Sequence, residues 1–465
     1  MSIVYRAGHI RGRAWVELSA EHYRAWGVTL GCQVPQRSKF LIAGDVRSSS
    51  AEYAAALAEG LCRAGMDVVD LGVLPAPVVD YAQRRLRAAG WAVVTGGNAP
   101  AEYNGLKWML AGRPGTQGQA HALRRALRSA PRVGRRPPGQ ARALDVTYDY
   151  VAWLQERFMD VPPLGRHVVL DPMHGAWACR SRRYLQAVFP HTVFSAIHDE
   201  PSGSFGGCVP DCSRLELLEA LAREVEHQGA CLGIAFDGDG DRVAFVDEQG
   251  TVLTSEETIW AFVQSFGAAW RGRAFVYDWR LAPQLAEAAS ALGAEPVAER
   301  SDHAALYRGM VRRKALLGAG LGGRYFFGEL GGADDALFAA CWMLGFLASH
   351  GTALSELRRQ CPRLFCTPEF RLPVPPARHA GVLGRLRQGS TGCTAIGSEG
   401  LRIEFPQGWL AARSDRAEGA LAFRFGASDW LALDALVWQV AEGLPEMGDR
   451  LWSSYQASQG ISAKL

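Results

Sequence analysis

One pattern recurs along the chain and constrains its fold more than any other: a short apolar run that leads into a loop containing aspartate. It occurs at Phe40–Asp45, His167–Asp171, Leu232–Asp237 and Ala274–Asp278. Helical segments such as the alanine-rich Ala51–Ala64 separate these runs. Strands that alternate with helices of this length predict βαβ units, and therefore an α/β fold with mixed, largely parallel sheets.

The same recurrence, together with the length of 465 residues, predicts several domains rather than one core. It indicates three related α/β units, and Pro131–Arg142, rich in proline, glycine and arginine, is typical of a linker after the first. A proline-rich break at Pro373–Pro376 precedes a tail with its own pattern. In that tail Leu401–Phe405 and Leu421–Phe425 alternate like half-buried strands, and Asp429–Gly443 is predicted to be a helix.

Charge and hydropathy exclude several kinds of partner. The net charge of +3 is small for this length, so we expect no nucleic-acid binding and no general attraction to anionic membranes. Met1–Arg6 lacks the apolar core of a signal peptide, and the longest apolar run, Ala336–Ala348, is shorter than the ~20 helical residues that span a bilayer. That run predicts a buried helix and no membrane insertion. The 10 cysteines contain no CxxC pair. Free thiols in a reducing cytoplasm are the favoured interpretation, and zinc binding at Cys208 and Cys212 the weaker one.

The hexapeptide Asp237-Gly238-Asp239-Gly240-Asp241-Arg242 carries the strongest chemical signal. Three carboxylates alternate with glycines directly after a predicted strand. Glycine permits tight backbone geometry, so the side chains can converge on one hard cation. Without a cation, crowded carboxylates raise one another's pKa. A solvated acidic turn is the alternative interpretation, but the complete hexapeptide favours a metal site formed by Asp237, Asp239 and Asp241.

A second motif, Thr95–Lys107, has the sequence TGGNAPAEYNGLK and follows the predicted strand Trp91–Val94. It resembles the active-site loop of the α-D-phosphohexomutases, the family of phosphomannomutase and phosphoglucomutase. In that family a serine of this loop carries the phosphoryl group that is handed to the sugar. Here the position is Gly97, and the adjacent His-Asn pair is Asn98-Ala99. Gly97 has no side chain to phosphorylate, and Thr95 is the weaker candidate for a replacement nucleophile.

The resemblance covers essentially the whole chain. Tyr5–Gly12 is similar to the family's Phe-Arg-Ala-Tyr-Asp-Ile-Arg-Gly, and Gly44–Ser49 with the helix after it is typical family sequence. The resemblance implies four domains around a central cleft, three of them α/β and the last a smaller α+β domain. The implied domains are 1–140 with the phosphoserine loop, 141–250 with the metal loop, 251–366 with the sugar loop and 367–465 with the phosphate loop.

The resemblance also implies roles for individual residues. The family's metal loop holds Mg²⁺ together with the phosphoserine, so this chain is expected to bind Mg²⁺ more weakly without that ligand. The family's equivalent of Arg242 approaches the phosphoserine. Lys107 and His303 match a lysine and a histidine of the family's cleft, and a surface or structural role is the alternative for each. The retained cleft residues are then Arg11, Lys107 and His303.

The family's sugar-recognition loop, usually Gly-Glu-Met-Ser-Gly-His, can be aligned with this sequence in two registers. One uses the literal Gly-Glu of Gly328-Glu329. The preferred register uses Leu316–Phe327, because its terminal Phe-Phe and its spacing from the upstream histidine both fit. It puts Gly320, Gly322 and Arg324 in place of the glutamate, serine and histidine. Recognition of sugar hydroxyls needs polar side chains, which glycine does not supply.

The family's phosphate clamp corresponds to Arg413–Gly419. Its first arginine and its glutamate fit the family pattern. Asp415 and Ala417, however, stand where a serine and a threonine bind phosphate oxygens, and aspartate repels a phosphate dianion. Arg416 offers partial compensation, since guanidinium binds phosphate well. An ordinary surface loop is the favoured interpretation.

Three of the four loops have thus lost side chains that handle phosphate or sugar, and the metal loop is intact. We therefore predict a phosphohexomutase-like protein without normal intramolecular phosphotransferase activity, acting as a non-catalytic regulator or protein partner in polysaccharide precursor metabolism. One alternative is an active Mg²⁺-dependent phosphohexomutase of altered mechanism or substrate. It would bind a sugar bisphosphate directly, or act on a different phosphorylated substrate through Mg²⁺ and Arg242. The other is a structural or assembly protein with a vestigial cleft. Whichever function holds, the candidate phosphate-binding residues are Arg242, Arg324 and Arg413.

Overall fold

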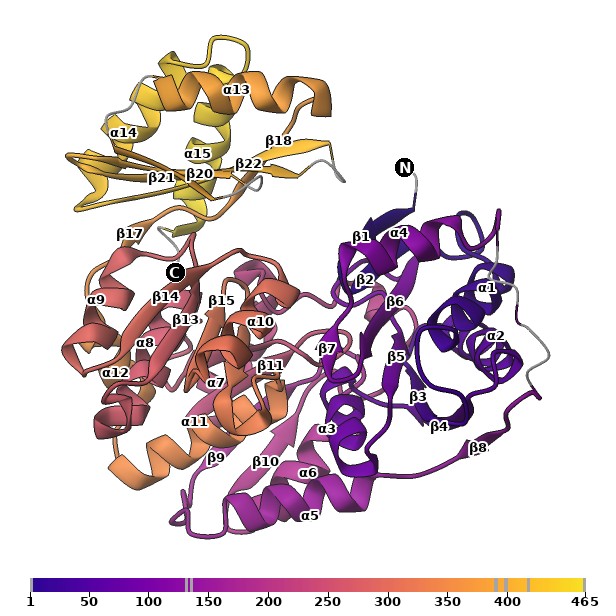
Figure 1. The fold of residues 1–465 in the computed structure, drawn as a ribbon. Coiled ribbons are helices and arrows are strands. Elements are labelled where there is room, and N and C mark those ends of the chain that lie inside the picture. The colour runs from indigo at the N-terminus through magenta and orange to yellow at the C-terminus, as the bar shows by residue number, and fades with distance from the viewer. Residues whose placement is uncertain are drawn as a thin grey trace. The chain divides into compact units, whose positions relative to one another are not determined.

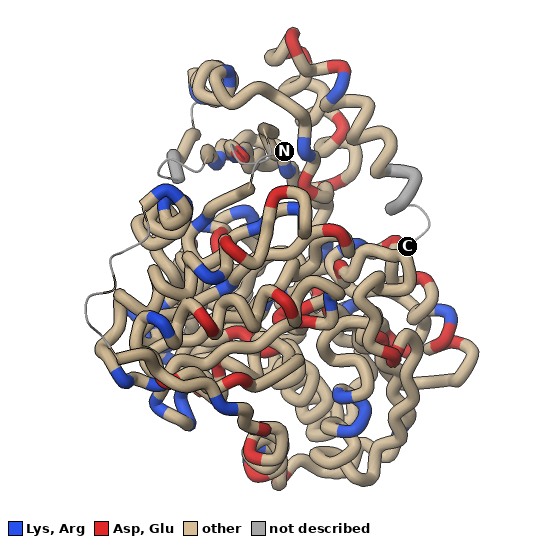
Figure 2. Tube along the Cα trace, turned by 90° about the vertical axis from the view of Figure 1, so that its right-hand side faces the viewer, with Lys and Arg blue, Asp and Glu red and all other residues tan. Residues whose placement is uncertain are grey.

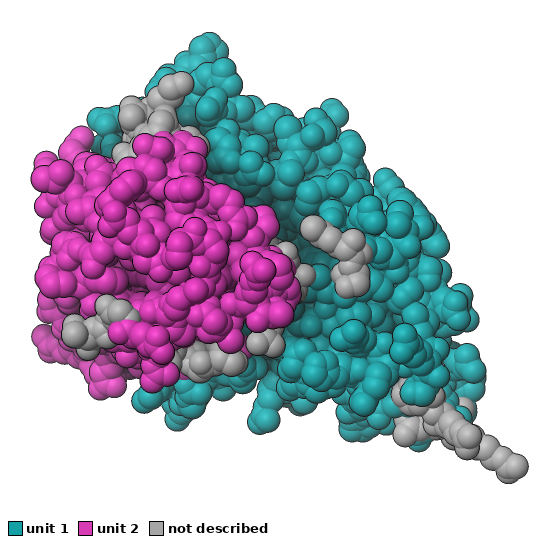
Figure 3. Space-filling view, turned by 90° about the horizontal axis from the view of Figure 1, so that it is seen from above, with its two compact units in different colours: residues 1–265, 302–358 teal, residues 266–301, 359–465 magenta. Residues whose placement is uncertain are grey.

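In a computed structural model the chain consists of two compact units, shown in separate colours in Figure 3. Helices and strands alternate along the chain (Figure 1), and the predicted α/β fold is confirmed. Unit 1 comprises residues 1–265 and 302–358, and unit 2 comprises residues 266–301 and 359–465. The structure describes residues 3–129, 133, 137–388, 392–396, 400–415 and 419–462.

The first sheet of unit 1 has the strand order β1-β2-β6-β5-β3-β4-β8, with β7 paired to β6. The β3 strand pairs in parallel with both β4 and β5, whereas β6 returns antiparallel to β5. These pairings place the motif that follows β5 at the edge where the parallel strands end. The strands are β1 (Val4–Arg6), β2 (His9–Arg13), β3 (Lys39–Gly44), β4 (Asp67–Val73), β5 (Gly90–Val94), β6 (Tyr103–Leu110), β7 (Arg113–Pro114) and β8 (Ala141–Ala143).

Two of the helices on this sheet, α1 (Ala20–Gly31) and α2 (Ser50–Arg63), pack closely against each other because glycines line their contact. A Cβ atom on Gly60 would lie 2.1 Å from the carbonyl oxygen of Arg24, so a larger residue would force the helices apart. The apolar faces of these helices bury Trp26 and Leu57 against Phe40 of the sheet. The helices on this sheet are α1 (Ala20–Gly31), α2 (Ser50–Arg63), α3 (Ala76–Leu86) and α4 (Gln117–Arg125).

The predicted linker Pro131–Arg142 is only partly within the described residues. Residues 131–132 and 134–136 lie outside them. Its last residues belong to a strand instead, since β8 (Ala141–Ala143) pairs in parallel with β4. The prediction of a linker is therefore wrong for Ala141 and Arg142, because backbone pairing with β4 overrides their unremarkable local sequence.

The second sheet of unit 1 has the order β10-β9-β11-β12. The β9 strand pairs in parallel with β10 and β11, and β12 returns antiparallel to β11. Loops that follow β9, β10 and β11 therefore lie at the same edge of the sheet. The elements are β9 (His167–Asp171), β10 (Val193–Ala196), β11 (Leu232–Phe236), β12 (Val243–Asp247), α5 (Thr147–Arg157), α6 (Ser181–Val188), α7 (Glu219–Gln228), η1 (Phe205–Gly207) and η2 (Leu215–Leu218).

The remainder of unit 1 contains the predicted buried helix, which is α11 (Ala336–His350). Nearly all of its apolar side chains are buried. Among the described residues no single helix is long and apolar enough to cross a membrane; only α11 and α12 together pass that test, as a pair bent by 90°. The other elements are α8 (Ser255–Phe266), α10 (His303–Arg313), β15 (Leu317–Gly320), β16 (Arg324–Phe327), η4 (Gly328–Leu330) and α12 (Leu354–Gln360).

Unit 2 contains the parallel strand pair β13 and β14 and the C-terminal tail, residues 359–465. The tail forms a sheet in the order β17-β22-β21-β20-β19, with β18 paired to β22. The elements are η3 (Gly267–Trp270), β13 (Ala274–Asp278), α9 (Pro283–Ala291), β14 (Glu295–Glu299), β17 (Phe365–Cys366), β18 (Phe370–Pro373), α13 (Pro376–Gln388), β19 (Gly392–Ile396), β20 (Gly400–Phe405), β21 (Gly408–Asp415), β22 (Ala420–Ala427), α14 (Trp430–Glu442) and α15 (Gly448–Ser462).

The predicted half-burial of Leu421–Phe425 is wrong, because β22 is buried along its whole length. One face, with Phe423 and Phe425, joins the core beneath the tail helices. On the other face Arg424 lies over the ring of Trp409, with its guanidinium carbon 5.7 Å from the ring centroid. A charged side chain therefore covers the face that the alternating pattern assigned to solvent.

Asp335 gives the fold a testable dependence on pH. It is the N-cap of α11, where its carboxylate accepts a hydrogen bond from the Phe338 N–H at 3.0 Å and another from the Tyr150 hydroxyl at 2.9 Å. Burial raises the pKa of Asp335 to about 7. The folded state therefore holds this proton more tightly than the unfolded state does. The resulting stabilisation is present at acidic pH and is lost as the pH rises through about 7.

An Asp335→Asn variant keeps a capping side chain but has no charge to bury. We expect it to be more stable than wild type near pH 8, by at most about 4 kcal/mol, with the difference vanishing near pH 4. Urea unfolding across this range measures the effect. The matched control is Asp429→Asn at the exposed N-cap of α14, where the Ala432 N–H lowers the carboxyl pKa. This control should lose stability near pH 8, and equal behaviour of the two variants would contradict the prediction.

Candidate functional site

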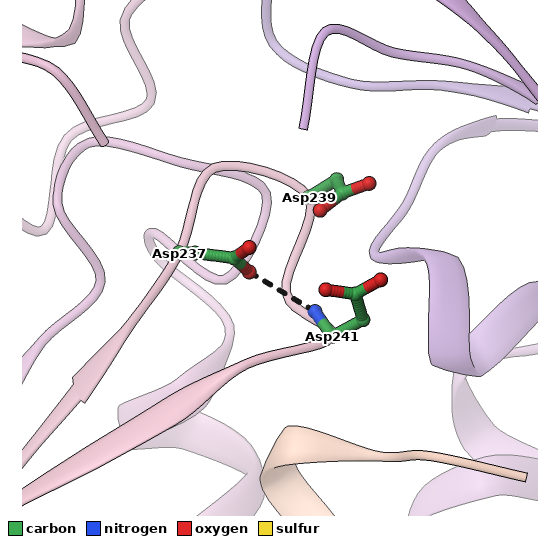
Figure 4. A group of neighbouring side chains, drawn as sticks. All are labelled: Asp237, Asp239 and Asp241. Atoms are coloured by element: carbon green, nitrogen blue, oxygen red, sulfur yellow. Dashed lines mark hydrogen bonds between the residues drawn. The ribbon is translucent and has the colours of Figure 1, made fainter. Parts of the chain in front are cut away.

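Three aspartates meet in the loop between β11 and β12, with their side chains directed toward one another (Figure 4). One carboxylate oxygen from each of Asp237, Asp239 and Asp241 lies within 4.8 Å of the other two, and all three residues are buried. Charged residues of both signs are interspersed along the chain as a whole (Figure 2). The convergence of three like charges at one buried point is therefore a local property of this loop.

The backbone of the loop is folded around Asp237. Its Oδ1 accepts hydrogen bonds from the N–H groups of Gly240 at 3.0 Å, Asp241 at 3.1 Å and Arg242 at 3.2 Å. Gly240 has φ +77°, and a Cβ atom there would lie 2.4 Å from Nε1 of Trp177. Glycine is thus required at this turn by conformation and by space. The spacing of the hexapeptide is what makes the carboxylates converge.

The loop around Gly97 packs directly against the acidic loop. A Cβ atom on Gly238 would lie 2.6 Å from the carbonyl oxygen of Gly97. A Cβ atom on Gly97 itself would lie 3.7 Å from Oδ1 of Asp239 and 2.6 Å from Nη2 of Arg11. The position where the resemblance implies a nucleophile thus faces the acidic cluster and Arg11. In this chain that position has no side chain.

Asp45 and Arg47 hold the Gly97 loop in place, a role that was not predicted from the sequence. The Arg47 guanidinium donates to the carbonyl oxygens of Gly97 at 2.8 Å and Ala99 at 2.7 Å, and to Asp45 at 3.0 Å. Asp45 also accepts the hydroxyl hydrogen bond of Thr95 at 2.7 Å. The Thr95 hydroxyl is thus committed to the loop scaffold, which disfavours it as a replacement nucleophile. The sequence did offer a signal for this role, since Asp45 and Arg47 are two charged residues directly after the buried strand β3.

Cationic side chains from different elements of unit 1 surround the acidic cluster. Nζ of Lys107, which extends from β6, forms ion pairs with Asp239 and, at 2.5 Å, with Asp241. Arg324 lies 2.9 Å from Asp241. Nε of Arg242 lies 3.7 Å from Oδ2 of Asp237. The residues of this unit therefore supply positive charge to the same oxygens that would ligate a metal.

The pKa shifts show how this charge is distributed. Burial, together with the carboxylates of Asp241 and Asp239, raises the pKa of Asp237 well above its ordinary value. Burial also raises the pKa of Asp241, but Arg324 and Lys107 more than offset it and hold that pKa below its ordinary value. Burial lowers the pKa of Lys107, and the two aspartates that it pairs with produce a net rise. Lys107 thus stays charged, and Asp237 is the carboxylate left least compensated.

These contacts fit a hard divalent cation. Apart from the ion pair with Lys107, the buried carboxylate oxygens of Asp239 make no hydrogen bond within the described residues, and the cation paired with Asp237, Arg242, stays 3.7 Å away. Mg²⁺ binds through one or two carboxylates, completed by water and phosphate oxygens. The ammonium group of Lys107 lies among the same oxygens and must be displaced before a metal ion binds. The donor set is suitable, and Lys107 is its internal competitor.

Asp334 links the predicted cleft histidine to this cluster. Nε2 of His303, at the start of α10, lies 2.9 Å from Oδ1 of Asp334, and Arg324 donates to Oδ2 of Asp334 at 2.7 Å. Through its second contact Arg324 also reaches Asp241. Arg324 therefore contacts the acidic loop directly, and His303 is linked to it through Asp334 and Arg324.

The two registers of the sugar loop lead to different places in unit 1. A Cβ atom on Gly322 would lie 3.2 Å from Nη1 of Arg242, beside the acidic loop. Glu329 instead forms a two-bond ion pair with Arg157 at 2.7 and 2.9 Å, and this pair is partly exposed. The segment containing Gly320 and Gly322 thus lies next to the metal loop, and Glu329 pairs with α5.

The predicted phosphate clamp of unit 2 is a strand rather than a surface loop at its start. Arg413 belongs to β21, which pairs with β20 and β22 on both sides. Its guanidinium donates to Glu369 at 2.9 and 2.6 Å and lies 3.4 Å from Asp415. The prediction of a surface loop is wrong for Arg413 because the backbone of β21 is paired with a strand on both edges. Arg416, Ala417 and Glu418 of the predicted clamp lie outside the described residues.

Glu369 was not recognised from the sequence, because it lies far from Arg413 along the chain. It also pairs with Arg280, which Asp278 holds at 2.6 Å. Burial raises the pKa of Glu369, but Arg280 and Arg413 more than offset it and hold that pKa below its ordinary value. Arg280 and Arg413 are therefore both paired with carboxylates of the chain itself.

The α/β sheets, the buried Asp-Gly-Asp-Gly-Asp loop and the loop that faces it define a protein of the sugar-phosphate mutase class. Residues 3–131 match the model of phosphoglucomutase/phosphomannomutase, alpha/beta/alpha domain I, and residues 149–250 match the model of domain II. The chain belongs to the phosphoglucomutase/phosphomannomutase family, the phosphohexomutases.

Relatives of this family match the chain over nearly its whole length. Phosphomannomutase/phosphoglucomutase of Pseudomonas aeruginosa is 27% identical over 431 residues, which cover 91% of each protein. The crystal structure of a phosphoglucomutase/phosphomannomutase family protein from Burkholderia thailandensis has a TM-score of 0.85 at 27% identity, covering 94% of this chain and 96% of that one. Aspergillus fumigatus N-acetylphosphoglucosamine mutase, at 12% identity, TM-scores of 0.59 and 0.60 and 96% coverage of both chains, shares the fold.

Proposed function

We propose that this chain is a non-catalytic phosphohexomutase homologue that binds a sugar phosphate and acts as a regulator or protein partner in polysaccharide precursor metabolism. The observation that supports it is the position of Gly97. This residue faces Asp239 and Arg11, where the family's nucleophilic serine would stand, and offers no atom to phosphorylate. Removal of a covalent nucleophile costs roughly a millionfold in rate in the best-studied hydrolase.

The contacts of the other loops support the same proposal. Gly320 and Gly322 have no side chains for sugar hydroxyls. Arg324 is paired with Asp241 and Asp334, and Arg413 with Glu369. A guanidinium already held by buried carboxylates gains little by exchanging them for a phosphate, since both are anionic partners of similar geometry.

Binding of a sugar phosphate is consistent with one of the structural relatives. A serine-to-alanine variant of Aspergillus fumigatus N-acetylphosphoglucosamine mutase was solved with glucose 1,6-bisphosphate, and the same enzyme with GlcNAc-6P and magnesium. We propose that the present chain takes a sugar phosphate in the same class of site and Mg²⁺ at Asp237, Asp239 and Asp241. A cytoplasmic location is part of this proposal.

A second candidate is an active Mg²⁺-dependent mutase of altered mechanism, favoured by the intact acidic loop with Arg242 beside it. In that case a sugar bisphosphate would have to supply the phosphoryl group that the chain does not carry. The substrate would then replace the missing serine as the phosphoryl donor, and the acidic loop would hold the cation.

A coupled mutase assay distinguishes the two candidates. With glucose 1-phosphate or mannose 1-phosphate and Mg²⁺, we expect turnover below roughly one millionth of that of the Pseudomonas aeruginosa enzyme run in parallel. A catalytic amount of glucose 1,6-bisphosphate is added in a second series. Turnover well above that level in either series would refute the non-catalytic proposal. Calorimetry with the same sugar phosphates is expected to show binding, and no binding would favour a structural protein instead.

A further inference from the structure

Two histidines lie side by side in unit 1, in loops that the proposed function does not use. His174 follows β9 and His198 follows β10, and these strands run parallel, so both loops lie at one edge of the second sheet. The N–H of His174 donates to the carbonyl oxygen of His198 at 2.9 Å. The ring centroids are 5.1 Å apart, with 47° between the ring planes.

Each ring has its Nδ1 committed to an oxygen that only accepts. Nδ1 of His198 lies 3.1 Å from both carboxylate oxygens of Asp171, and Nδ1 of His174 lies 2.9 Å from the carbonyl oxygen of Glu200. Nδ1 therefore carries the hydrogen in both rings, and each neutral imidazole presents the lone pair of Nε2. Within the described residues neither Nε2 makes a hydrogen bond. An acceptor on the second nitrogen is the arrangement found around metal-ligating histidines.

The backbone holds both histidines in a conformation that L-residues avoid. His174 has φ +57° and His198 has φ +48°, with Met173 at +47° and Cys179 at +62° in the same region. Each left-handed residue other than glycine costs about 1–2 kcal/mol. Such strain persists only where the surrounding structure imposes it, and it concentrates at functional sites.

The spacing of the rings is that of two ligands on one ion. Two imidazoles bound to a tetrahedral zinc at about 2.0–2.1 Å per nitrogen have their ring centroids about 5 Å apart. The side chain of His198 is 42% exposed, so an ion has access from solvent. A Cβ atom on Gly206 would lie 2.8 Å from Nε2 of His174, so glycine at this position keeps a side chain away from the nitrogen.

We propose that His174 and His198 form a second metal site, for a divalent transition-metal ion such as Zn²⁺, with water completing the coordination. Imidazole nitrogen suits zinc, copper and nickel, whereas the carboxylates of Asp237, Asp239 and Asp241 suit magnesium. The chain thus has two sites of different chemistry, and the second does not depend on whether the protein is a mutase.

Zinc titration of the full chain tests this site. The protein carries no histidine tag, its thiols are blocked with iodoacetamide because Cys179 and Cys208 are exposed, and excess Mg²⁺ is present throughout. The buffer is near pH 8, since hydrogen bonding to Asp171 raises the pKa of His198. We expect one Zn²⁺ per chain, with affinity reduced at least about tenfold by His174→Asn or His198→Asn.

Asparagine is chosen because it tolerates the left-handed backbone, so both variants keep the fold. The matched control is His191→Asn, which removes an exposed histidine from the loop before β10. It should leave the affinity unchanged, as should Asp239→Asn in the acidic loop. No saturable binding by the wild type, or binding that survives both histidine variants, would overturn the proposal.

Discussion

A Gly97→Ser variant is expected to fold and to remain inactive as a mutase. The backbone at this position has φ +57°, so a serine costs about 1–2 kcal/mol of stability. Its Cβ would lie 2.6 Å from Nη2 of Arg11, and the flexible end of the arginine side chain can move to relieve this contact. The new hydroxyl would face Asp239, but the sugar loop still presents Gly320 and Gly322. A restored nucleophile is not sufficient for turnover, because without side chains that recognise the sugar the substrate is not positioned for phosphoryl transfer.

The same coupled assay measures this result, with turnover expected to stay at the wild-type background. Gly97→Ala is the matched control, because it adds the same backbone strain and the same Cβ without a hydroxyl. Both variants should melt at similarly lowered temperatures. If Gly97→Ser gains turnover of several orders of magnitude over Gly97→Ala, the sugar and phosphate sites still function and only the nucleophile has been lost.

The strands and helices of this chain were predictable because their signals are local. The run at Leu232–Phe236 has no polar side chain, as expected of a strand buried on both faces, and it is β11 in the structure. The hexapeptide that follows sets its own geometry, since Asp237 hydrogen-bonds backbone groups only three to five residues away. A site built within one loop can be predicted from that loop alone.

The partners of the site residues were not predictable, because they come from distant parts of the chain. Lys107 reaches Asp241 from the first sheet, 134 residues away in sequence. Arg413 meets Glu369 across 44 residues, and nothing in the sequence around either residue indicates the pair. Lys107 was identified as a retained residue, but its position among the metal-binding oxygens follows only from how two sheets pack. The fold thus determines which charged side chains of the site are paired, and the motifs alone do not indicate these pairs.

Replacement of Lys107 by methionine should increase affinity for Mg²⁺ by at least about tenfold, since an ion then no longer competes with a cation among its ligands. In wild type the ammonium pairs with Asp239 and Asp241, and a metal ion has to displace it. Methionine keeps most of the length of the side chain and removes its charge. Calorimetric titration of both proteins with MgCl₂ measures the difference.

The same variant should lose stability when Mg²⁺ is absent and regain it when Mg²⁺ is added. Loss of one partner from a buried ion pair costs about 3–5 kcal/mol, because it leaves carboxylates buried without compensation. Arg24→Met is the matched control, since its ion pair with Glu59 is exposed and worth at most about 1 kcal/mol. Thermal unfolding with and without Mg²⁺ should separate the two. A Lys107→Met protein with wild-type affinity and no response to Mg²⁺ would show that the lysine does not occupy the acidic loop in solution. Arg324 and Arg242 would then be the cations that neutralise the loop.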